Sequence, residues 1–208
     1  MQKDVTTQNL PRPDPRSLRT RTAIEDAFLD ALKSGNQQTN LTVTEISKAA
    51  GITRKTFYAH YASLDDVVAA RLRRVFEDVL PLFEGPALKL PWASRALTEA
   101  TLTRLACHRE TLAPLLLRAN GAPFMAAANE AAEVLLIRAL AINSLPPLAT
   151  APRTYLLAMI AGVTHGLLLA WARRDFSDPA KDLAVVMDAA LSEGIQRLLV
   201  PASGRQQP

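Results

Sequence analysis

Helix start and stop signals recur at close intervals in residues 41–66, LTVTEISKAAGITRKTFYAHYASLDD. Thr42, followed three residues later by Glu45, matches the capping box that begins an α-helix. Gly51 can adopt the left-handed backbone conformation that ends a helix, and Thr53 can cap the next one. The stretch therefore predicts two short helices joined by a tight turn and followed at once by a third, which is a helix-turn-helix arrangement.

The second of these helices has an apolar face and a polar face. Its outward positions are Arg54, Lys55, Thr56, Tyr58 and His60. Such a helix can enter the major groove of DNA, where Arg and Lys neutralise phosphates or donate to guanine and hydroxyl groups contact phosphates or base edges. Capped helix starts also present backbone N–H groups that suit phosphate oxygens. The DNA-binding candidates are Arg21, Thr42, Thr53, Arg54, Lys55, Thr56, Tyr58 and His60.

The run AAGITRKTFYAHYASLDDVV, residues 49–68, resembles the N-terminal DNA-binding domain of the TetR family of transcriptional regulators. The matching residues are Ala49, Ala50, Gly51, Ile52, Thr53, Tyr58, His60, Tyr61 and Asp65. Leu64 departs from the pattern, because the family usually has at this position a Lys that reaches a phosphate. The motif covers residues of about 17–75. The resemblance implies a dimeric DNA-binding regulator, most often a repressor that a small-molecule ligand releases.

Composition favours an all-α fold of moderate size. Apolar residues make up 49% of the 208 residues and aromatic residues only 5%, while the 14 prolines fall between periodic segments. A formal charge of +4 is compatible with a nucleic-acid partner but modest. The single cysteine, Cys107, excludes an intrachain disulfide framework and fits a cytoplasmic protein, and the N-terminus has no secretory signal pattern.

Breaks in the helical pattern divide the chain into an N-terminal three-helix DNA-binding domain and a C-terminal helical bundle. The predicted parts are a disordered arm (1–15), the helix-turn-helix domain (16–62), a connecting helix (63–80), a ligand-binding and dimerisation domain (81–200) and a disordered tail (201–208). Helices are expected at about 17–33, 63–80, 91–107, 109–117, 123–142, 151–174 and 178–199. On the connecting helix, Arg71, Arg73 and Arg74 are interpreted as a solvated face, and a second DNA site is the alternative.

The last two helices predict a homodimer interface. Small residues recur every four positions on the first of them, at Ala158, Gly162, Gly166 and Ala170. The remaining surface of that helix is also apolar, and the final helix has a broad apolar stripe, so two copies of the pair would form a four-helix bundle. The alternative is an internal core pair in a monomer. Because Thr164 and His165 interrupt a segment barely long enough to span a bilayer, no membrane partner is expected.

No arrangement of residues favours catalysis, a metal site or a cofactor. The histidines lie on separate helices, and the adjacent Cys107 and His108 point about 100 degrees apart on a helix, which makes them a poor metal pair. Phosphate loops and nucleophile elbows are also missing from the sequence. The protein is therefore not expected to be an enzyme.

A ligand cavity in the C-terminal domain is expected to combine apolar walls with a few polar groups. The candidates in the predicted site are Arg104, His108, Met125, Asn129, His165 and Trp171, with Trp92 and Met159 as further possibilities. For each of them, an ordinary core or surface position is the alternative. His108 and His165 stand out, since a polar group on an otherwise apolar helix needs a partner.

These patterns together predict a dimeric, sequence-specific regulator that binds a near-palindromic operator in double-stranded DNA. The resemblance to the TetR family implies that this regulator is a repressor, released by an unidentified small-molecule effector. The alternative is a helical interaction or adaptor module with no DNA-binding role, in which the face with Arg54 and Lys55 is merely solvated.

Overall fold

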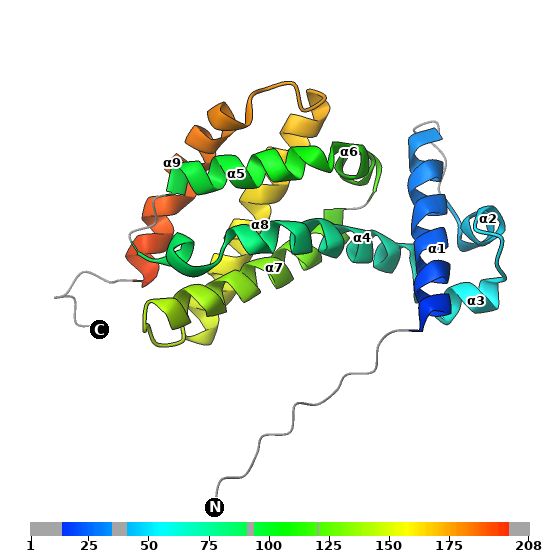
Figure 1. Ribbon diagram of the computed structural model, residues 1–208, viewed down its shortest axis with the longest axis horizontal. Helices are drawn as coiled ribbons and strands as arrows, with labels where there is room; N and C mark the ends of the chain where they lie inside the picture. The colour runs from blue at the N-terminus through cyan, green and yellow to red at the C-terminus, as the bar shows by residue number, and fades with distance from the viewer. Residues whose placement is uncertain (1–13, 35–40, 91–93, 120, 200–208) are drawn as a thin grey trace, which may run out of the picture.

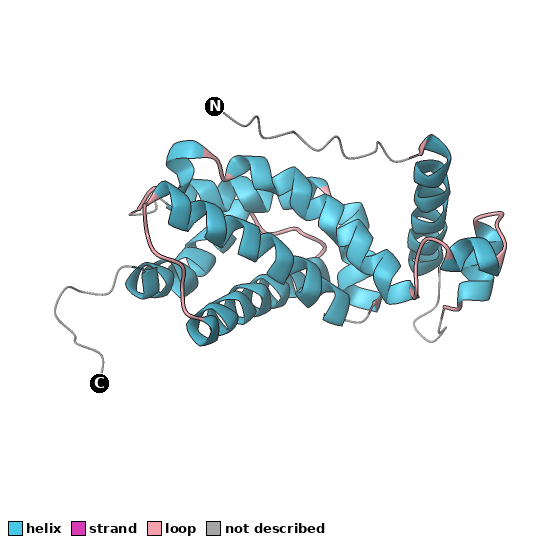
Figure 2. Cartoon of the chain, turned by 90° about the horizontal axis from the view of Figure 1, so that it is seen from below, coloured by secondary structure: helices cyan, strands magenta, loops and turns pink. Residues whose placement is uncertain are grey.

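The structure is a computed structural model that describes residues 14–34, 41–90, 94–119 and 121–199. Over these residues the chain forms helices, turns and loops without a β-strand, which confirms the predicted all-α fold (Figure 1, Figure 2). The α-helices are α1 (Pro15–Ser34), α2 (Val43–Ala49), α3 (Arg54–Tyr58), α4 (Leu64–Val79), α5 (Ser94–Cys107), α6 (Arg109–Arg118), α7 (Gly121–Ile142), α8 (Thr150–Arg173) and α9 (Ala180–Leu199). Two short 3-10 helices, η1 (Leu80–Leu82) and η2 (Gly85–Leu88), separate α4 from α5. The predicted arm up to residue 13 and the tail 201–208 lie outside the described residues.

The helix signals around α2 and α3 act as predicted. The Thr42 hydroxyl accepts a 3.3 Å hydrogen bond from the N–H of Glu45, and the Glu45 carboxylate accepts a 2.9 Å bond from the N–H of Thr42. Gly51 has φ +66, a conformation that glycine adopts without steric cost. The Thr53 hydroxyl accepts a 3.1 Å bond from the N–H of Thr56 at the start of α3. These local bonds fix the turn between the two helices.

A shared core holds α3 in place against α1, α2 and α4. Ile24 and Phe28 of α1, Ile46 of α2, Phe57 of α3 and Val67 of α4 are all buried in it. Because α3 is only five residues long, it could not persist as an isolated helix. Its orientation therefore depends on burial of Phe57.

The α4 helix leaves the small N-terminal unit and continues into a larger bundle (Figure 1). There α4 packs on α7, α5 packs on α9, and α8 packs on both α6 and α7. Leu72 and Phe76 of α4 belong to the same buried cluster as Leu102 of α5 and Leu112 of α6. The α4 helix is thus part of both cores and links them physically.

Asn143, just beyond the end of α7, holds the segment that follows η2. Its amide nitrogen donates to the carbonyls of Leu88 (2.8 Å) and Ala139 (2.7 Å), and its amide oxygen accepts a 2.9 Å bond from the N–H of Leu90. A single side chain therefore attaches the η2 segment to α7.

The α8 helix leaves an apolar face uncovered in the single chain. Tyr155 is 75% exposed, Met159 is also exposed, and the stripe of small residues at Ala158, Gly162, Gly166 and Ala170 is exposed beside them. By length and composition α8 could cross a membrane, a test that core helices of globular proteins also pass. The apolar surface of α8 is therefore covered only in part within one chain.

Candidate nucleic-acid interface and helical-domain cavity

The α3 helix directs its basic and aromatic polar side chains away from the core. Arg54, Lys55 and Tyr58 are exposed, whereas Phe57 is fully buried. The Tyr58 ring packs edge-on against Phe57, with centroids 5.6 Å apart, while half of its surface (50%) stays exposed. The Arg54 guanidinium carbon lies 6.0 Å from the centre of the Tyr58 ring. This end of the molecule therefore presents two cations around an anchored aromatic ring.

The threonines near α3 are largely occupied with capping. The hydroxyls of Thr53 and Thr56 share a 2.9 Å hydrogen bond. The Thr42 hydroxyl donates to the Glu45 carboxylate at 2.8 Å, and this carboxylate also accepts the N–H of Thr42. Thr42 therefore holds the start of α2 and has no donor left for a phosphate. His60 lies just beyond α3 and is half-buried.

Arg21 contacts Tyr61 rather than extending freely from α1. Its Nε donates a 3.3 Å hydrogen bond to the Tyr61 hydroxyl, and its guanidinium carbon lies 5.2 Å from the centre of that ring. The hydrogen bond to Tyr61 raises the pKa of the Arg21 guanidinium above its ordinary value. Tyr61 donates in turn to Glu25 at 2.5 Å, and burial raises the pKa of the Tyr61 phenol. Arg21 thereby keeps its charge beside α3 while supporting the α1 packing.

Glu25 is a buried carboxylate that the sequence analysis did not identify. Its side chain has no exposed surface, and Arg74 and Arg71 of α4 approach it at 3.0 Å and 3.5 Å. Arg71 also pairs with Asp26 at 3.3 Å. A buried charge is tolerated only when opposite charges and hydrogen bonds compensate it. The glutamate therefore requires the arginines of α4.

Arg73 and Arg74 are exposed, as expected for a solvated face, but these two residues and Arg71 also form ion pairs with neighbouring helices. While Arg71 and Arg74 pair with α1, Arg73 forms a two-pronged ion pair with Glu130 of α7, with N–O distances of 2.5 Å and 2.9 Å. Helical periodicity shows which face a residue occupies, but it does not show which element lies opposite. The α4 arginines are cross-links from the connecting helix to both neighbouring parts of the molecule.

A second link joins the larger bundle to α1. The guanidinium of Arg118, the last residue of α6, donates to the carbonyls of Leu32 and Lys33 near the end of α1, the latter at 3.3 Å. A cation at a helix C-terminus interacts favourably with the unpaired carbonyls there. The position of α1 therefore depends on both α4 and α6.

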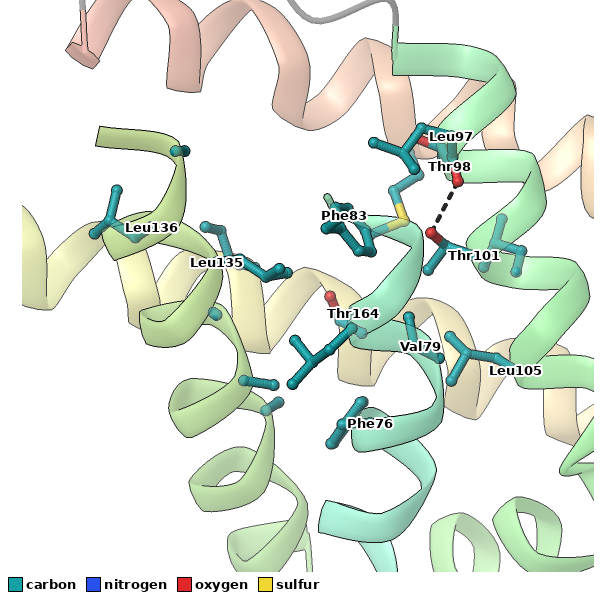
Figure 3. A pocket seen from close by; sticks show the side chains of 18 of the residues that line it. Phe76, Val79, Phe83, Leu97, Thr98, Thr101, Leu105, Leu135, Leu136 and Thr164 are labelled. Atoms are coloured by element: carbon teal, nitrogen blue, oxygen red, sulfur yellow. Dashed lines mark hydrogen bonds between the residues drawn. The ribbon is translucent and has the colours of Figure 1, made fainter. Parts of the chain in front are cut away.

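The bundle contains a partly open cavity of about 230 Å³ (Figure 3). Side chains from α4, α5, α7, α8 and α9 line it, and η1 and η2 complete its wall. The wall is mostly aliphatic and aromatic, with Phe76 and Val79 of α4 on one side and Leu135 of α7 on another. The cavity therefore lies against the same helix that carries the arginines paired with Glu25.

None of the predicted ligand residues Arg104, His108, Met125, Asn129, His165 and Trp171 lines this cavity. Arg104 and His108 instead pair with Asp78 on the surface, at 3.4 Å and 2.9 Å. The hydrogen bond with His108, followed by the charge of Arg104, lowers the pKa of Asp78. The sequence-based candidates were the more polar side chains, whereas the described residues that line the cavity are mostly apolar.

The other candidates have structural partners of their own or lie in the core. The His165 ring packs on Phe124 with centroids 4.9 Å apart, and Trp171 Nε1 donates to the carbonyl of Asp178 at 3.0 Å. Met125 is half-buried against the core, and the amide oxygen of Asn129 is buried without a hydrogen bond among the described residues. Met159 is exposed, and Trp92 lies outside the described residues. Within the same described part, no group of three or more His, Cys, Asp or Glu residues is placed to hold a metal.

Two solved structures have a fold similar to this arrangement of helices. A TetR transcriptional regulator from Streptococcus agalactiae 2603V superimposes with a TM-score of 0.52 at 19% identity, over 83% of this chain and 94% of that one. The TetR-family repressor AlkX from Dietzia sp. strain DQ12-45-1b, implicated in biodegradation of n-alkanes, gives 0.51 at 16% identity, over 88% and 98%.

This is the TetR-family fold.

In TetR-fold regulators the N-terminal helices form a DNA-binding domain, and α1–α3 hold that position here. The similar solved structures are named as regulators. In sequence, 67 residues are 33% identical to an uncharacterized HTH-type transcriptional regulator, YxbF, of Bacillus subtilis (strain 168). That match covers 32% of this chain and 18% of the relative, so it spans less than a fifth of the relative's length. No protein-family model matches the sequence.

Proposed function

We propose that the protein is a dimeric, sequence-specific DNA-binding transcriptional regulator of the cytoplasm, and specifically a repressor that a small molecule releases. The observation that carries the proposal is the exposed α3 face, where Arg54, Lys55 and Tyr58 surround an anchor formed by buried Phe57. Groups of this kind bind phosphates and base edges in the major groove.

Rigid support of α3 favours a role in recognition over a merely solvated surface. Tyr61, three residues beyond α3, is tied to Glu25, and Glu25 is tied to Arg74 of α4. Such bonds reduce the freedom of α3 relative to α1, so less conformational entropy is lost when the face docks on DNA. In this role Arg54 and Lys55 neutralise phosphates, and Tyr58 reaches a phosphate or a base edge. Arg21 adds a charge from α1.

The uncovered apolar surface of the last two helices supports a homodimer. Tyr155 and Met159 of α8 are exposed, as are Val185 and Val186 of α9. Apart from the backbone of α8 itself, a Cβ added at Gly162 or Gly166 would meet no atom of the described residues within 4 Å, so a second helix has room to approach α8 closely. A second copy of the same surface would cover it in a symmetric four-helix interface. Two α3 helices would then bind half-sites about 34–36 Å apart, as in other helix-turn-helix dimers.

Ligand response follows from the position of α4. Phe76 and Val79 near its C-terminal end line the cavity, while Arg71 and Arg74 nearer its middle hold Glu25 of α1. A ligand that fits the cavity better with α4 displaced would favour a different spacing of the two α3 helices. Its differential affinity for the two arrangements would release the DNA.

Selection from random DNA duplexes tests the proposal directly. Purified full-length protein is incubated with the pool at low salt, and the bound duplexes are recovered and sequenced. An enriched near-palindrome is the expected result, with affinity that falls steeply as salt is added. Folded protein that enriches no sequence and binds DNA without salt dependence would favour the adaptor alternative instead.

A further inference from the structure

Among the described residues that line the cavity, none has a charged side chain. Of the residues that line it, the polar ones are the threonines Thr98 and Thr101 of α5 and Thr164 of α8. A carboxylate or an ammonium group inside this wall would lose its hydration without gaining an opposite charge. The cost of burying an unpaired charge is large, so the cavity discriminates against ions.

The three threonines differ in their capacity to bind a ligand. The hydroxyl of Thr101 donates to the backbone carbonyl of Leu97 at 2.8 Å, so its proton is already used (Figure 3). Within the described part of the chain, the hydroxyls of Thr98 and Thr164 form no hydrogen bond. Figure 3 shows Thr164 between Val79 and Leu135 in the apolar wall. A polar group of the ligand could therefore pair with Thr164 or Thr98.

Cavity volume limits the size of the ligand. An apolar protein cavity of about 150 Å³ holds one benzene molecule. The 230 Å³ available here is about half as large again, which corresponds to about ten non-hydrogen atoms.

We propose that this cavity binds an uncharged, largely hydrocarbon molecule of about ten non-hydrogen atoms with a single hydroxyl or carbonyl oxygen. The oxygen pairs with the hydroxyl of Thr164 or Thr98, and the hydrocarbon body contacts the aliphatic wall. This inference deepens the proposed function. It rests on that function only for the statement that the bound molecule controls DNA binding.

Binding of three probes with one carbon skeleton tests the ligand class. We would titrate the full chain, without DNA, with 1-octanol, octanoate and octylammonium at neutral pH and measure the heat of binding. We expect 1-octanol to bind at least about tenfold more tightly than either ion, because only the ions bring a charge into the cavity. Equal or tighter binding of an ion, or no binding of 1-octanol, would overturn the proposal.

Substitutions in the wall locate the site. Ala131→Leu on α7 and Ala87→Leu on η2 fill the cavity from different elements, so the test does not depend on one variant folding normally. Toluene is added here as a probe without an oxygen atom. Each folded variant is expected to bind 1-octanol and toluene about tenfold or more weakly than the parent protein, since the added methyl groups occupy the space of the ligand. Retained binding in a folded variant would place the probes elsewhere and overturn the assignment.

Threonine variants test the role of the hydroxyl groups. Thr164→Val and Thr98→Val keep the shape of the side chain but remove its hydroxyl. At least one of them is expected to weaken 1-octanol binding about threefold to tenfold while leaving toluene binding unchanged. Thr101→Val is the matched control, because its hydroxyl is already bonded to Leu97. If all three variants bind 1-octanol like the parent protein, the assigned polar contact is wrong.

Different measurements test the chemical class of the ligand and the proposed role in DNA binding. The probe titrations need no DNA, so a neutral ligand supports this inference even if the protein selects no duplex. Protein that binds 1-octanol yet keeps its selected duplex supports the ligand class and overturns ligand-controlled release. Release by an ion that does not bind the cavity would overturn the cavity as the effector site.

Discussion

Tyr61 donates a 2.5 Å hydrogen bond to Glu25, a carboxylate with no exposed surface. This contact joins the segment after α3 to the middle of α1. Because Arg71 and Arg74 approach the same carboxylate, it also joins both elements to α4. The orientation of the candidate DNA-binding face is therefore connected to the helix that borders the cavity.

Removal of the Tyr61 hydroxyl should destabilise the protein without changing its shape. In Tyr61→Phe the buried carboxylate of Glu25 loses a donor, and the free energy of unfolding should fall by about 1–3 kcal/mol. Urea denaturation followed by circular dichroism measures this change. Tyr58→Phe is the matched control and should stay within about 0.5 kcal/mol of the parent, since Tyr58 is half exposed. Equal stability of the two variants would contradict a structural role for the Tyr61–Glu25 bond.

The ion pair between Arg73 and Glu130 predicts a pH-dependent part of the stability. The hydrogen bond from Arg73 lowers the pKa of Glu130 below its ordinary 4.5. Because the pKa of Glu130 is lower in the folded protein, the ion pair stabilises the fold at pH values above the pKa of the unfolded chain. This stabilisation is lost as the pH falls through the folded-state pKa. Wild type should therefore exceed Glu130→Gln by about 0.2–1 kcal/mol at neutral pH, and the difference should disappear in acid. A difference that grows on acidification would show that the carboxylate is not stabilised by Arg73.

Lys55→Ala should weaken binding to the selected duplex by about tenfold. The slope of log affinity against log salt concentration should become shallower by about one, which corresponds to the loss of one phosphate contact. Tyr58→Ala should also weaken binding, because the exposed ring is part of the same face. Fluorescence anisotropy at several salt concentrations measures both effects, with helical content and oligomeric state checked in parallel. Lys89→Ala removes the same charge from the bundle and should bind like the parent. Unchanged affinity in Lys55→Ala would mean that α3 is not oriented toward DNA.

Val186→Glu should convert the proposed dimer into a monomer. Val186 is 61% exposed on α9, so a glutamate fits the single chain but would bring two uncompensated charges into a symmetric interface. Light scattering after size-exclusion chromatography measures the mass. Leu18→Glu places the same charge at an exposed apolar position of α1 and should leave the mass unchanged. A Val186→Glu dimer would require a different interface.

Local signals made the helix-turn-helix predictable. The bonds between Thr42 and Glu45 span three residues, and the left-handed conformation of Gly51 is a property of one residue. The ends of α4 and α6 to α9 also fall within a few residues of their expected positions, because prolines and small polar residues interrupt the helical period there. Such features depend on neighbouring residues alone.

Contacts between distant segments could not be predicted in the same way. The partners of Glu25 lie 36 residues away at Tyr61 and 49 residues away at Arg74. A glutamate on an amphipathic helix is usually solvated, and its sequence neighbours do not indicate otherwise. The cavity was missed for a related reason, because its wall consists of ordinary core residues whose separation depends on how the helices cross.

Arg118 donates hydrogen bonds to the main-chain carbonyls of Leu32 and Lys33 in α1. Replacing the side chain of Lys33 would leave its carbonyl, and hence the hydrogen bond, unchanged. A mutational scan along α1 would detect the connection through Glu25 but would pass over this second one. Genetic variation in the side chains at the end of α1 can therefore accumulate while these two hydrogen bonds persist, whereas a change at position 118 removes both of them.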